Sequence, residues 1–202
     1  MQIVRQASFS AKPWKNGGGL TREVIRVPAG SGTFRWRVSV AQIDVPGPFS
    51  DFRGYDRIMV LLRGGGVRLH FDVAEPESLT AVGAMAQFDG ARKAQAELLN
   101  GPCTDLNLMV LQSLPHAATV EHLRAPRPVW GGHRETTLIF GITCALSIEC
   151  RGSPPEHLDP WDLAILPPGA AAVVAPDLDA RPGPAPGTTA SGLVFCATLD
   201  DN

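Results

Sequence analysis

The chain has 202 residues, of which 44% are hydrophobic and 19% charged, enough for one sizeable domain or two small, tightly packed halves. Its 21 glycines and 18 prolines argue against a helical bundle and favour short strands joined by turns. A net charge of −2 gives no case for nucleic-acid binding, and no apolar run reaches the roughly 18 residues of a membrane helix. Since residues 1–9 lack an apolar run behind a basic start, we expect a cytoplasmic protein without a secretory signal.

Charge is unevenly distributed along the chain. Residues 1–70 contain eleven basic and four acidic residues, a net of +7, whereas residues 71–202 have a net of −9. Nine of the eleven basic residues are arginine, whose planar guanidinium holds a carboxylate by two parallel hydrogen bonds. Two interpretations stay open. The charges attract the two halves to each other or solvate strand faces, or the first half contains an anion site.

Strand patterns dominate the first half of the chain. Residues 33–43 alternate apolar and polar side chains with a period of two, which predicts a strand with one apolar face. Glycines 64–66 predict a turn between two strands, whereas residues 91–99 fit either a short helix or a loop. The strands expected in this half are 33–43, 57–62, 67–71, 86–89 and 104–111.

The second half repeats this layout. Its expected strands are 136–140, 145–150, 162–166, 170–174 and 193–199. Gly141 follows Gly65 by 76 residues and Gly169 follows Gly90 by 79, which indicates an internal duplication of about 75–80 residues. Residues 114–128, with three prolines, are predicted to link the halves, and residues 177–191 to form a surface loop.

Short strands at regular spacing predict an all-β sandwich or small barrel. Residues 162–169, DLAILPPG, resemble the second sequence signature of cupins, in which an Asp, an apolar strand and a Pro-x-Gly turn follow one another. Two such units make a bicupin, that is, two tandem cupin or jelly-roll-like β-barrels. We expect an N-terminal half over 1–113, a linker over 114–128 and a C-terminal half over 129–202, packed as one globular unit.

Metal and cofactor sites are not predicted. None of the five histidines lies in the H-x-H…E arrangement that a cupin metal site requires, and the four cysteines form no C-x-x-C pair. There is also no G-x-S-x-G elbow for a nucleophilic serine. Glycines 17–19 precede a strand, so they predict either a tight turn or backbone N–H groups that approach an anion.

Polar side chains recur two residues apart on the predicted strands, so that each pair shares one face. Arg37 and Ser39 form one such pair, and Asp105 and Asn107 another. Facing inward, these groups are costly to bury unless they pair with each other or bind a ligand. One interpretation is a structural salt bridge between Arg37 and Asp105, with Asn107 bonded to the backbone. The other is a pocket in which Arg37 or Arg57 grips a carboxylate.

Four sequence blocks, in order across the first 110 residues, resemble the HutD/Ves family. They are PWKNGGGLTRE (13–23), FRWRVSVA (34–41), GPFSDFRGYDR (47–57) and DLNLM (105–109). Arg53 departs from the family pattern, which more often has proline before this glycine, and the change affects a turn rather than the proposed pocket. The second half resembles the family only in its general cupin character.

The resemblance implies a bicupin fold and a link to bacterial histidine utilisation. Family members are described as regulatory or accessory proteins that sense an intermediate such as urocanate or N-formylglutamate, both small carboxylates. We therefore predict a protein that binds a small carboxylate in the N-terminal barrel and is not an enzyme. The residues expected to bind it are Asn16, Thr21, Arg37, Ser39, Arg57, Asp105 and Asn107.

Two further functional interpretations remain open. A metal-independent isomerase or hydrolase could act on the same intermediates, with Asp105 or Glu23 as general base. Alternatively, the C-terminal half could be an interaction module for dimerisation or for a transcriptional partner. A homodimer is compatible with the sequence, whereas neither nucleic acid nor a membrane is expected as a partner.

Overall fold

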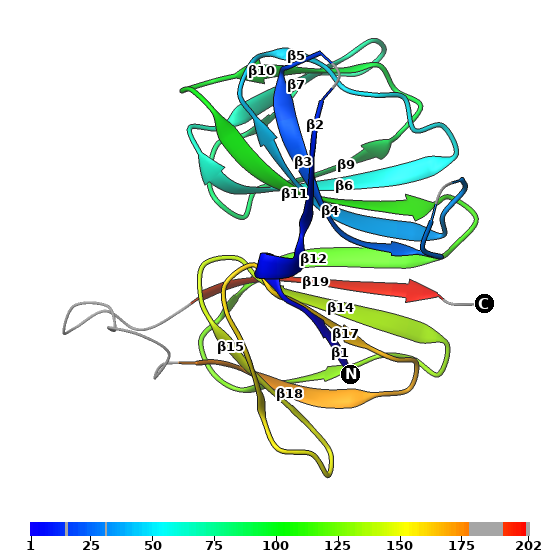
Figure 1. Cartoon of the computed structure of the whole chain (residues 1–202), viewed down its shortest axis with the longest axis vertical. Helices are drawn as coiled ribbons and strands as arrows, with labels where there is room; N and C mark the ends of the chain where they lie inside the picture. Colours follow the sequence, from blue (N-terminus) through cyan, green and yellow to red (C-terminus); the bar gives the residue numbers. More distant parts are fainter. Residues whose placement is uncertain (15, 31, 178–191, 201–202) are drawn as a thin grey trace, which may run out of the picture. The chain divides into compact units, whose positions relative to one another are not determined.

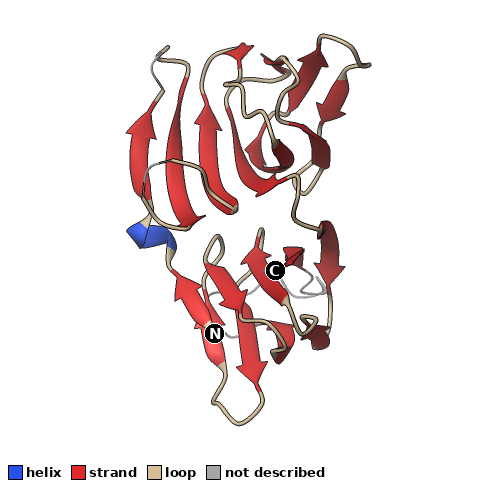
Figure 2. Cartoon of the chain, turned by 90° about the vertical axis from the view of Figure 1, so that its right-hand side faces the viewer, coloured by secondary structure: helices blue, strands red, loops and turns tan. Residues whose placement is uncertain are grey.

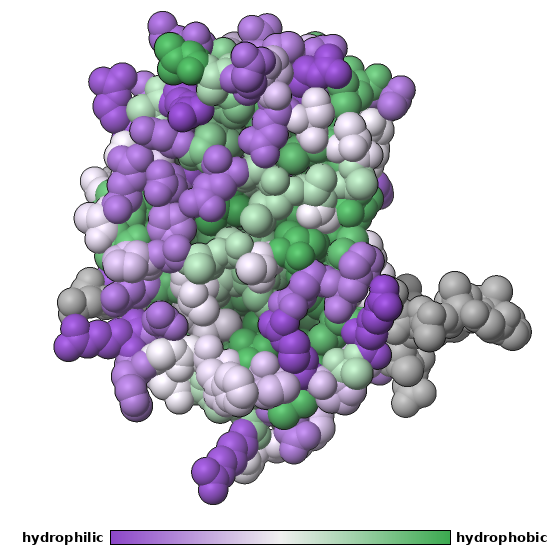
Figure 3. All heavy atoms as spheres, turned by 180° about the vertical axis from the view of Figure 1, so that it is seen from behind, coloured by the Kyte–Doolittle hydropathy of each residue, from purple (hydrophilic) through white to green (hydrophobic). Residues whose placement is uncertain are grey.

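The computed structural model describes residues 1–14, 16–30, 32–177 and 192–200. These residues form strands and loops with one 3₁₀ turn, η1 (Gln6–Ser8), so the all-β prediction is confirmed (Figure 2). None of the helical structure in these ranges has the length and apolar character needed to cross a bilayer. Hydrophilic and hydrophobic side chains are interspersed over the face shown in Figure 3.

The chain divides into two compact units. The N-terminal unit is Phe9–Ser113, and the C-terminal unit combines Met1–Ser8 with the chain from Leu114 onward. The first strand pairs with residues 163–165 of the C-terminal unit, although the sequence analysis placed residues 1–8 in the N-terminal half. The predicted loop 177–191 lies, apart from Asp177, outside the described residues.

The N-terminal unit contains a six-stranded sheet in the order β2-β3-β4-β11-β6-β9 and a four-stranded sheet in the order β5-β10-β7-β8 (Figure 1). The bounds of these strands are β2 (Ser10–Pro13), β3 (Gly19–Val27), β4 (Trp36–Ile43), β5 (Gly47–Pro48), β6 (Tyr55–Gly64), β7 (Val67–Phe71), β8 (Glu77–Leu79), β9 (Met85–Asp89), β10 (Ala94–Leu98) and β11 (Cys103–Leu111).

The C-terminal unit contains a five-stranded sheet in the order β1-β17-β14-β19-β12 and a four-stranded sheet in the order β13-β18-β15-β16. The bounds are β1 (Gln2–Val4), β12 (His116–Leu123), β13 (Arg127–Trp130), β14 (Glu135–Gly141), β15 (Leu146–Cys150), β16 (Glu156–Leu158), β17 (Leu163–Leu166), β18 (Ala171–Pro176) and β19 (Gly192–Asp200).

The two units share one strand order, which confirms the repeated layout predicted from the glycine spacing. The run β4-β11-β6-β9 corresponds to β12-β19-β14-β17, and β5-β10-β7-β8 corresponds to β13-β18-β15-β16. The predicted closed barrels are not confirmed, because the described strands form four open sheets. The hydrogen-bonded frame of each unit is therefore a pair of sheets.

Two segments differ from the sequence prediction. Residues 94–98, within the stretch expected as a helix or loop, form β10, because Ala94 and Ala96 are buried and the backbone pairs with β7. Alanine, glutamine and glutamate favour helices, and tertiary pairing overrides that preference here. The predicted linker 114–128 contains β12, an edge strand paired with β19. Pro115 and Pro126 lie outside this strand, and Pro128 lies in β13, which is also an edge strand.

Apolar side chains fill the space between the two sheets of the N-terminal unit. The inner side chains of β6 and β11 that join this cluster include Met59, Leu61 and Cys103, and β7 and β10 contribute Leu69 and Ala96 from the other sheet. Farther along the same strands the inner positions change from apolar to polar residues. The apolar core therefore packs against one end of the six-stranded sheet, and the polar positions farther along contribute to the site described below.

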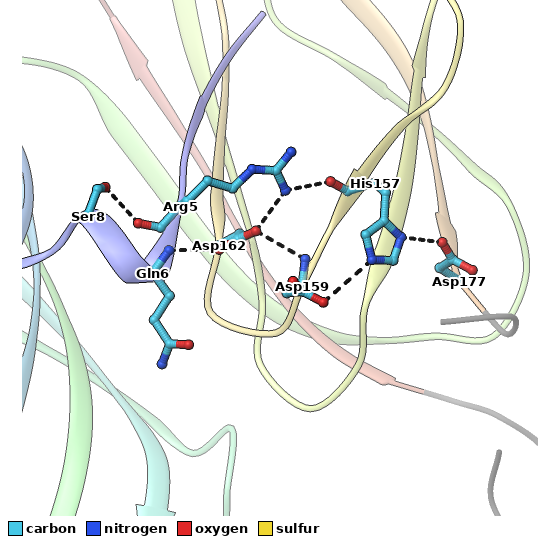
Figure 4. A network of polar contacts seen from close by, with 7 residues as sticks. All are labelled: Arg5, Gln6, Ser8, His157, Asp159, Asp162 and Asp177. Carbon is cyan, nitrogen blue, oxygen red and sulfur yellow. Dashed lines mark hydrogen bonds and ion pairs between the residues drawn. The ribbon is translucent and has the colours of Figure 1, made fainter. Parts of the chain in front are cut away.

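A buried aspartate fastens the N-terminal segment to the C-terminal unit (Figure 4). Asp162 Oδ1 accepts a hydrogen bond from the backbone N–H of Gln6 at 2.8 Å. Asp162 Oδ2 accepts from Arg5 Nη1 at 2.9 Å and from the Asp159 backbone N–H at 3.1 Å. The Asp162 side chain is 3% exposed, so the carboxylate that accepts these bonds is buried, whereas the Arg5 side chain is 47% exposed.

We expect Asp162→Ala to lower the free energy of unfolding by about 2–4 kcal/mol, since three hydrogen bonds at about 1 kcal/mol or more each are lost. Urea unfolding of the full chain measures this change. Asp159→Ala is the matched control, because the Asp159 side chain is 66% exposed and its backbone N–H survives the substitution. If Asp159→Ala were as unstable as Asp162→Ala, the stabilisation could not be assigned to the three hydrogen bonds of the Asp162 carboxylate.

Candidate functional site

A pocket of about 730 Å³ lies in the N-terminal unit. Its lining brings together all seven side chains predicted to bind a ligand, namely Asn16, Thr21, Arg37, Ser39, Arg57, Asp105 and Asn107. That these residues contact a ligand remains a prediction. Their convergence on one cavity is a property of the fold.

Strand register explains why residues distant in sequence converge. β11 lies between β4 and β6, and Met109 on β11 stands opposite Arg37 on one side and Arg57 on the other. Asn107 stands opposite Ser39, and alternate residues of a strand share one face. The pocket side chains therefore form successive rows across the six-stranded sheet.

Arg57 is a buried cation surrounded by aromatic rings. The residue is 5% exposed, and its Cζ lies 4.9, 5.6 and 5.1 Å from the ring centroids of Phe49, Phe52 and Phe88. Its Nη2 donates a hydrogen bond to Asn107 Oδ1 at 2.8 Å, whereas its Nε has no hydrogen-bond partner. Burial lowers the pKa of Arg57 to about 10, partly opposed by Asp105, so Arg57 is charged at neutral pH.

Asp105 is buried beside this arginine. Asp105 Oδ2 accepts a hydrogen bond from Asn107 Nδ2, and Asp105 Oδ1 has no hydrogen-bond partner. Burial raises the pKa of Asp105 to about 7, while the positive charge of Arg57 acts in the opposite direction. Arg57, Asn107 and Asp105 thus form a short polar chain along the pocket, with one unpartnered donor and one unpartnered acceptor.

Arg37 pairs with Glu23 and not with Asp105. Arg37 Nε lies 3.1 Å from Glu23 Oε2, an ion pair in which the Nε–H does not form a directed hydrogen bond. Burial lowers the pKa of Arg37, and the Glu23 carboxylate opposes that shift. A structural Arg37–Asp105 bridge is therefore not found, and Asn107 uses its side-chain amide to bond Arg57 and Asp105.

The glycine-rich loop of residues 16–19 is a structural turn. The Gly17 N–H donates to the Trp14 carbonyl at 3.1 Å, and the Gly18 N–H donates to Asn16 Oδ1 at 3.0 Å. A Cβ on Gly19 would lie 2.2 Å from the Gln42 carbonyl oxygen, so only glycine fits there. These contacts support the turn interpretation over the anion-binding one.

Aromatic walls are the part of the pocket that the sequence analysis missed. Trp14, Phe49 and Phe52 line it, and the Trp14 and Phe49 rings meet edge to face at 6.3 Å. Trp14 Nε1 donates to Thr21 Oγ1 at 2.7 Å, which ties the wall to a predicted ligand residue. All three aromatic residues lie outside the strands, where a period-2 pattern does not apply, but they fall in the same sequence blocks as the predicted residues.

The C-terminal unit repeats the frame without these polar groups. Arg57 is the third residue of β6, and the third residue of the corresponding β14 is Thr137. Asn107 stands opposite Met59, and the corresponding pair in the C-terminal unit is Cys196 opposite Ile139. An apolar cluster occupies the interior there. In the described part of the chain, no three His, Cys, Asp or Glu side chains are grouped to hold a metal ion.

Comparison with known proteins identifies the family. The HutD family model matches residues 6–180. The chain belongs to the HutD family. A protein of Pseudomonas putida, described as an uncharacterized 21.2 kDa protein in the hutC 3′ region, is 40% identical over 164 residues, 80% of this chain and 84% of that protein. Protein Ves of Escherichia fergusonii is 35% identical over 97 residues, about half of each chain.

Solved structures agree with this assignment. HutD from Pseudomonas fluorescens SBW25, determined in a formate condition, is 26% identical with a TM-score of 0.75 over 98% of both chains. A conserved protein of unknown function from Pseudomonas aeruginosa PAO1 is 28% identical with a TM-score of 0.85, also over 98% of both chains. An oxalate decarboxylase of Lactobacillus farciminis, 8% identical with a TM-score of 0.69 over 100% of this chain and 87% of that one, shows that this HutD-family chain shares the cupin fold.

Proposed function

We propose that this HutD-family protein is an accessory or regulatory protein of histidine utilisation that binds a small carboxylate in the pocket of its N-terminal, cupin-like unit. The observation that carries this proposal is Arg57, a buried cation that lines the pocket with an unpartnered Nε–H. An unsatisfied buried donor costs about 1–3 kcal/mol, and a carboxylate oxygen from a ligand would remove that cost.

The charges of the pocket support an anionic ligand. Arg37, Arg57 and Lys12 all line it, and the acidic groups beside them are Asp105 in the lining and Glu23, which pairs with Arg37. With the pKa of Asp105 near 7, its negative charge is only partly present at neutral pH. Two arginines in one cavity provide the planar, bidentate donors that carboxylates prefer. Asn16, Thr21, Ser39 and Asn107 also line the pocket, and in this proposal they orient the polar remainder of the ligand.

Its relatives supply the biological context for this proposal. The Pseudomonas putida relative lies in the hutC 3′ region, and the Pseudomonas fluorescens relative is named HutD. The latter was determined in a formate condition, and formate is the simplest carboxylate. We therefore take urocanate and N-formylglutamate as the candidate ligands, with formate as a minimal probe.

A thermal-shift series tests the proposal. We expect urocanate or N-formylglutamate, at about 100 times its dissociation constant, to stabilise the chain by about 2.7 kcal/mol. For a chain of this size that is a rise in melting temperature of roughly 5–10 °C. Histidine, glutamate and formate complete the series, and the methyl ester of urocanate is the matched control without a carboxylate. No shift with any acid, or an equal shift with the ester, would overturn the carboxylate pocket.

One observation favours a second candidate function. A buried carboxyl group with a pKa near 7 suits a general base, so Asp105 could act in a metal-independent isomerase or hydrolase. Following the urocanate absorbance and the consumption of N-formylglutamate, with the purified chain after EDTA treatment, separates this alternative from simple binding.

A further inference from the structure

We infer that the pocket selects small acids that carry an N–H donor at the end away from their carboxylate, and that Asp105 is the residue that accepts this donor. The inference rests on the proposed carboxylate site and adds a second contact to it, between Asp105 and the opposite end of the ligand. It therefore predicts discrimination between acids of equal shape and charge.

The first observation is the unpartnered oxygen of Asp105. The residue is 0% exposed and lines the pocket, and Asn107 occupies only its Oδ2. Its Oδ1 has no partner among the described residues. A buried acceptor left unsatisfied is destabilising, and a pocket ligand with a suitably placed donor would satisfy it.

The second observation is the distance between the two groups proposed to hold the ligand, the arginine guanidinium and the Asp105 carboxylate. Arg37 and Arg57 stand in the row of Met109, whereas Asp105 lies four residues away on β11, about 13 Å at 3.3 Å per residue. Because Arg57 reaches back to bond Asn107, the gap between the guanidinium and Asp105 is closer to two residues, roughly 7 Å. That gap matches the length of a small acid with functional groups at both ends.

The neighbours of Asp105 in the pocket wall are a small side chain and aromatic residues. Ala41 stands between Thr21 and Asp105 in the same row, so no side chain longer than a methyl group fills the middle of that row. Trp14 and Phe49 line the same pocket, with their rings edge to face. A planar, unsaturated ligand body fits such walls better than a bulky branched one.

A pair of matched acids tests the inference. Urocanate carries an imidazole N–H, and 3-(2-furyl)acrylate has the same carboxylate, linker and ring size without the N–H. We expect calorimetry at pH 8, above the pKa of Asp105, to show that wild-type protein binds urocanate at least about tenfold more tightly than it binds 3-(2-furyl)acrylate. The ratio of these two dissociation constants is the quantity compared below. In Asp105→Asn, which keeps the shape and removes the charge, the ratio should fall to about threefold or less.

Each outcome decides the question. Equal wild-type affinity for the two acids would overturn the role of Asp105 and leave the carboxylate site standing, and this comparison does not depend on how the variant folds. A ratio unchanged in Asp105→Asn would also overturn it. Failure of both acids and of formate to bind would overturn the proposed function as well. Glu97→Gln is the control, because Glu97 is 46% exposed and does not line the pocket, so its ratio should equal that of wild type.

Discussion

Arg57→Ala is expected to weaken binding of urocanate or N-formylglutamate by about 100-fold or more. Hydrogen bonds to charged groups contribute about 1.5–3 kcal/mol each, so loss of a two-bond contact reaches that factor. The alanine variant also leaves Asn107 Oδ1 and the three surrounding phenylalanine rings without the guanidinium that they contact. Calorimetric titration of the full chain measures the loss.

Arg57→Lys separates charge from geometry. Lysine keeps a positive charge but lacks the planar fork, so we expect a loss of about tenfold, between wild type and alanine. Arg53→Ala is the control, since the Arg53 side chain is 80% exposed and outside the pocket lining. Urea unfolding of each variant confirms that it is folded. If folded Arg57→Ala and folded Arg37→Ala both bound the acids with wild-type affinity, the proposal that these arginines bind the ligand carboxylate would be refuted.

Regular alternation made several strands predictable from sequence. The segment predicted over 67–71 has the observed bounds of β7, and the prediction over 104–111 misses β11 by one residue. In β7 the period of two follows from one face packing in the core, whereas β11 is buried on both faces and its alternation separates polar from apolar residues. The same alternation placed Arg37, Ser39, Asp105 and Asn107 on inner faces, so the polar floor of the pocket could be predicted before its geometry was known.

Long-range pairing was not predictable. β1 pairs with β17, which begins about 160 residues later, and three residues of an amphipathic strand carry no signal for that partner. The partner of Glu23 was not predictable either, because its pairing with Arg37 depends on the irregular register between β3 and β4. A register shift moves side chains relative to the neighbouring strand, and a single sequence gives no measure of it.

Loops limited the prediction of the site for a different reason. Trp14, Phe49 and Phe52 reach the pocket from turns, where backbone direction changes at each residue and periodicity is lost. The turn at residues 16–19 is held by its own hydrogen bonds. A further bond from Trp14 Nε1 to Thr21 Oγ1 holds the Trp14 ring, and the sequence alone could not distinguish this turn from an anion-binding loop.

Asp105→Asn is expected to remove a pH dependence of stability that the wild-type protein shows. Burial raises the pKa of Asp105 from 3.8 to about 7, so between these values the folded protein holds a proton that the unfolded chain has released. Stability therefore falls as pH rises through this interval, by about 1.4 kcal/mol per pH unit at most. From pH 5 to pH 8 the loss assigned to Asp105 is about 2–3 kcal/mol.

Asparagine has the shape and charge of the protonated Asp105 side chain. We therefore expect the variant and the wild type to have similar free energies of unfolding at pH 5, and the variant to be more stable by about 2–3 kcal/mol at pH 8. Urea unfolding at both pH values measures the difference, in which other titrating groups such as His157 cancel because both proteins contain them. A difference that stays constant between pH 5 and pH 8 would show that Asp105 titrates in the folded protein as it does in the unfolded chain. In that case the buried carboxylate would already be stabilised as an anion by Arg57, and the pocket would hold much less net positive charge for a carboxylate ligand.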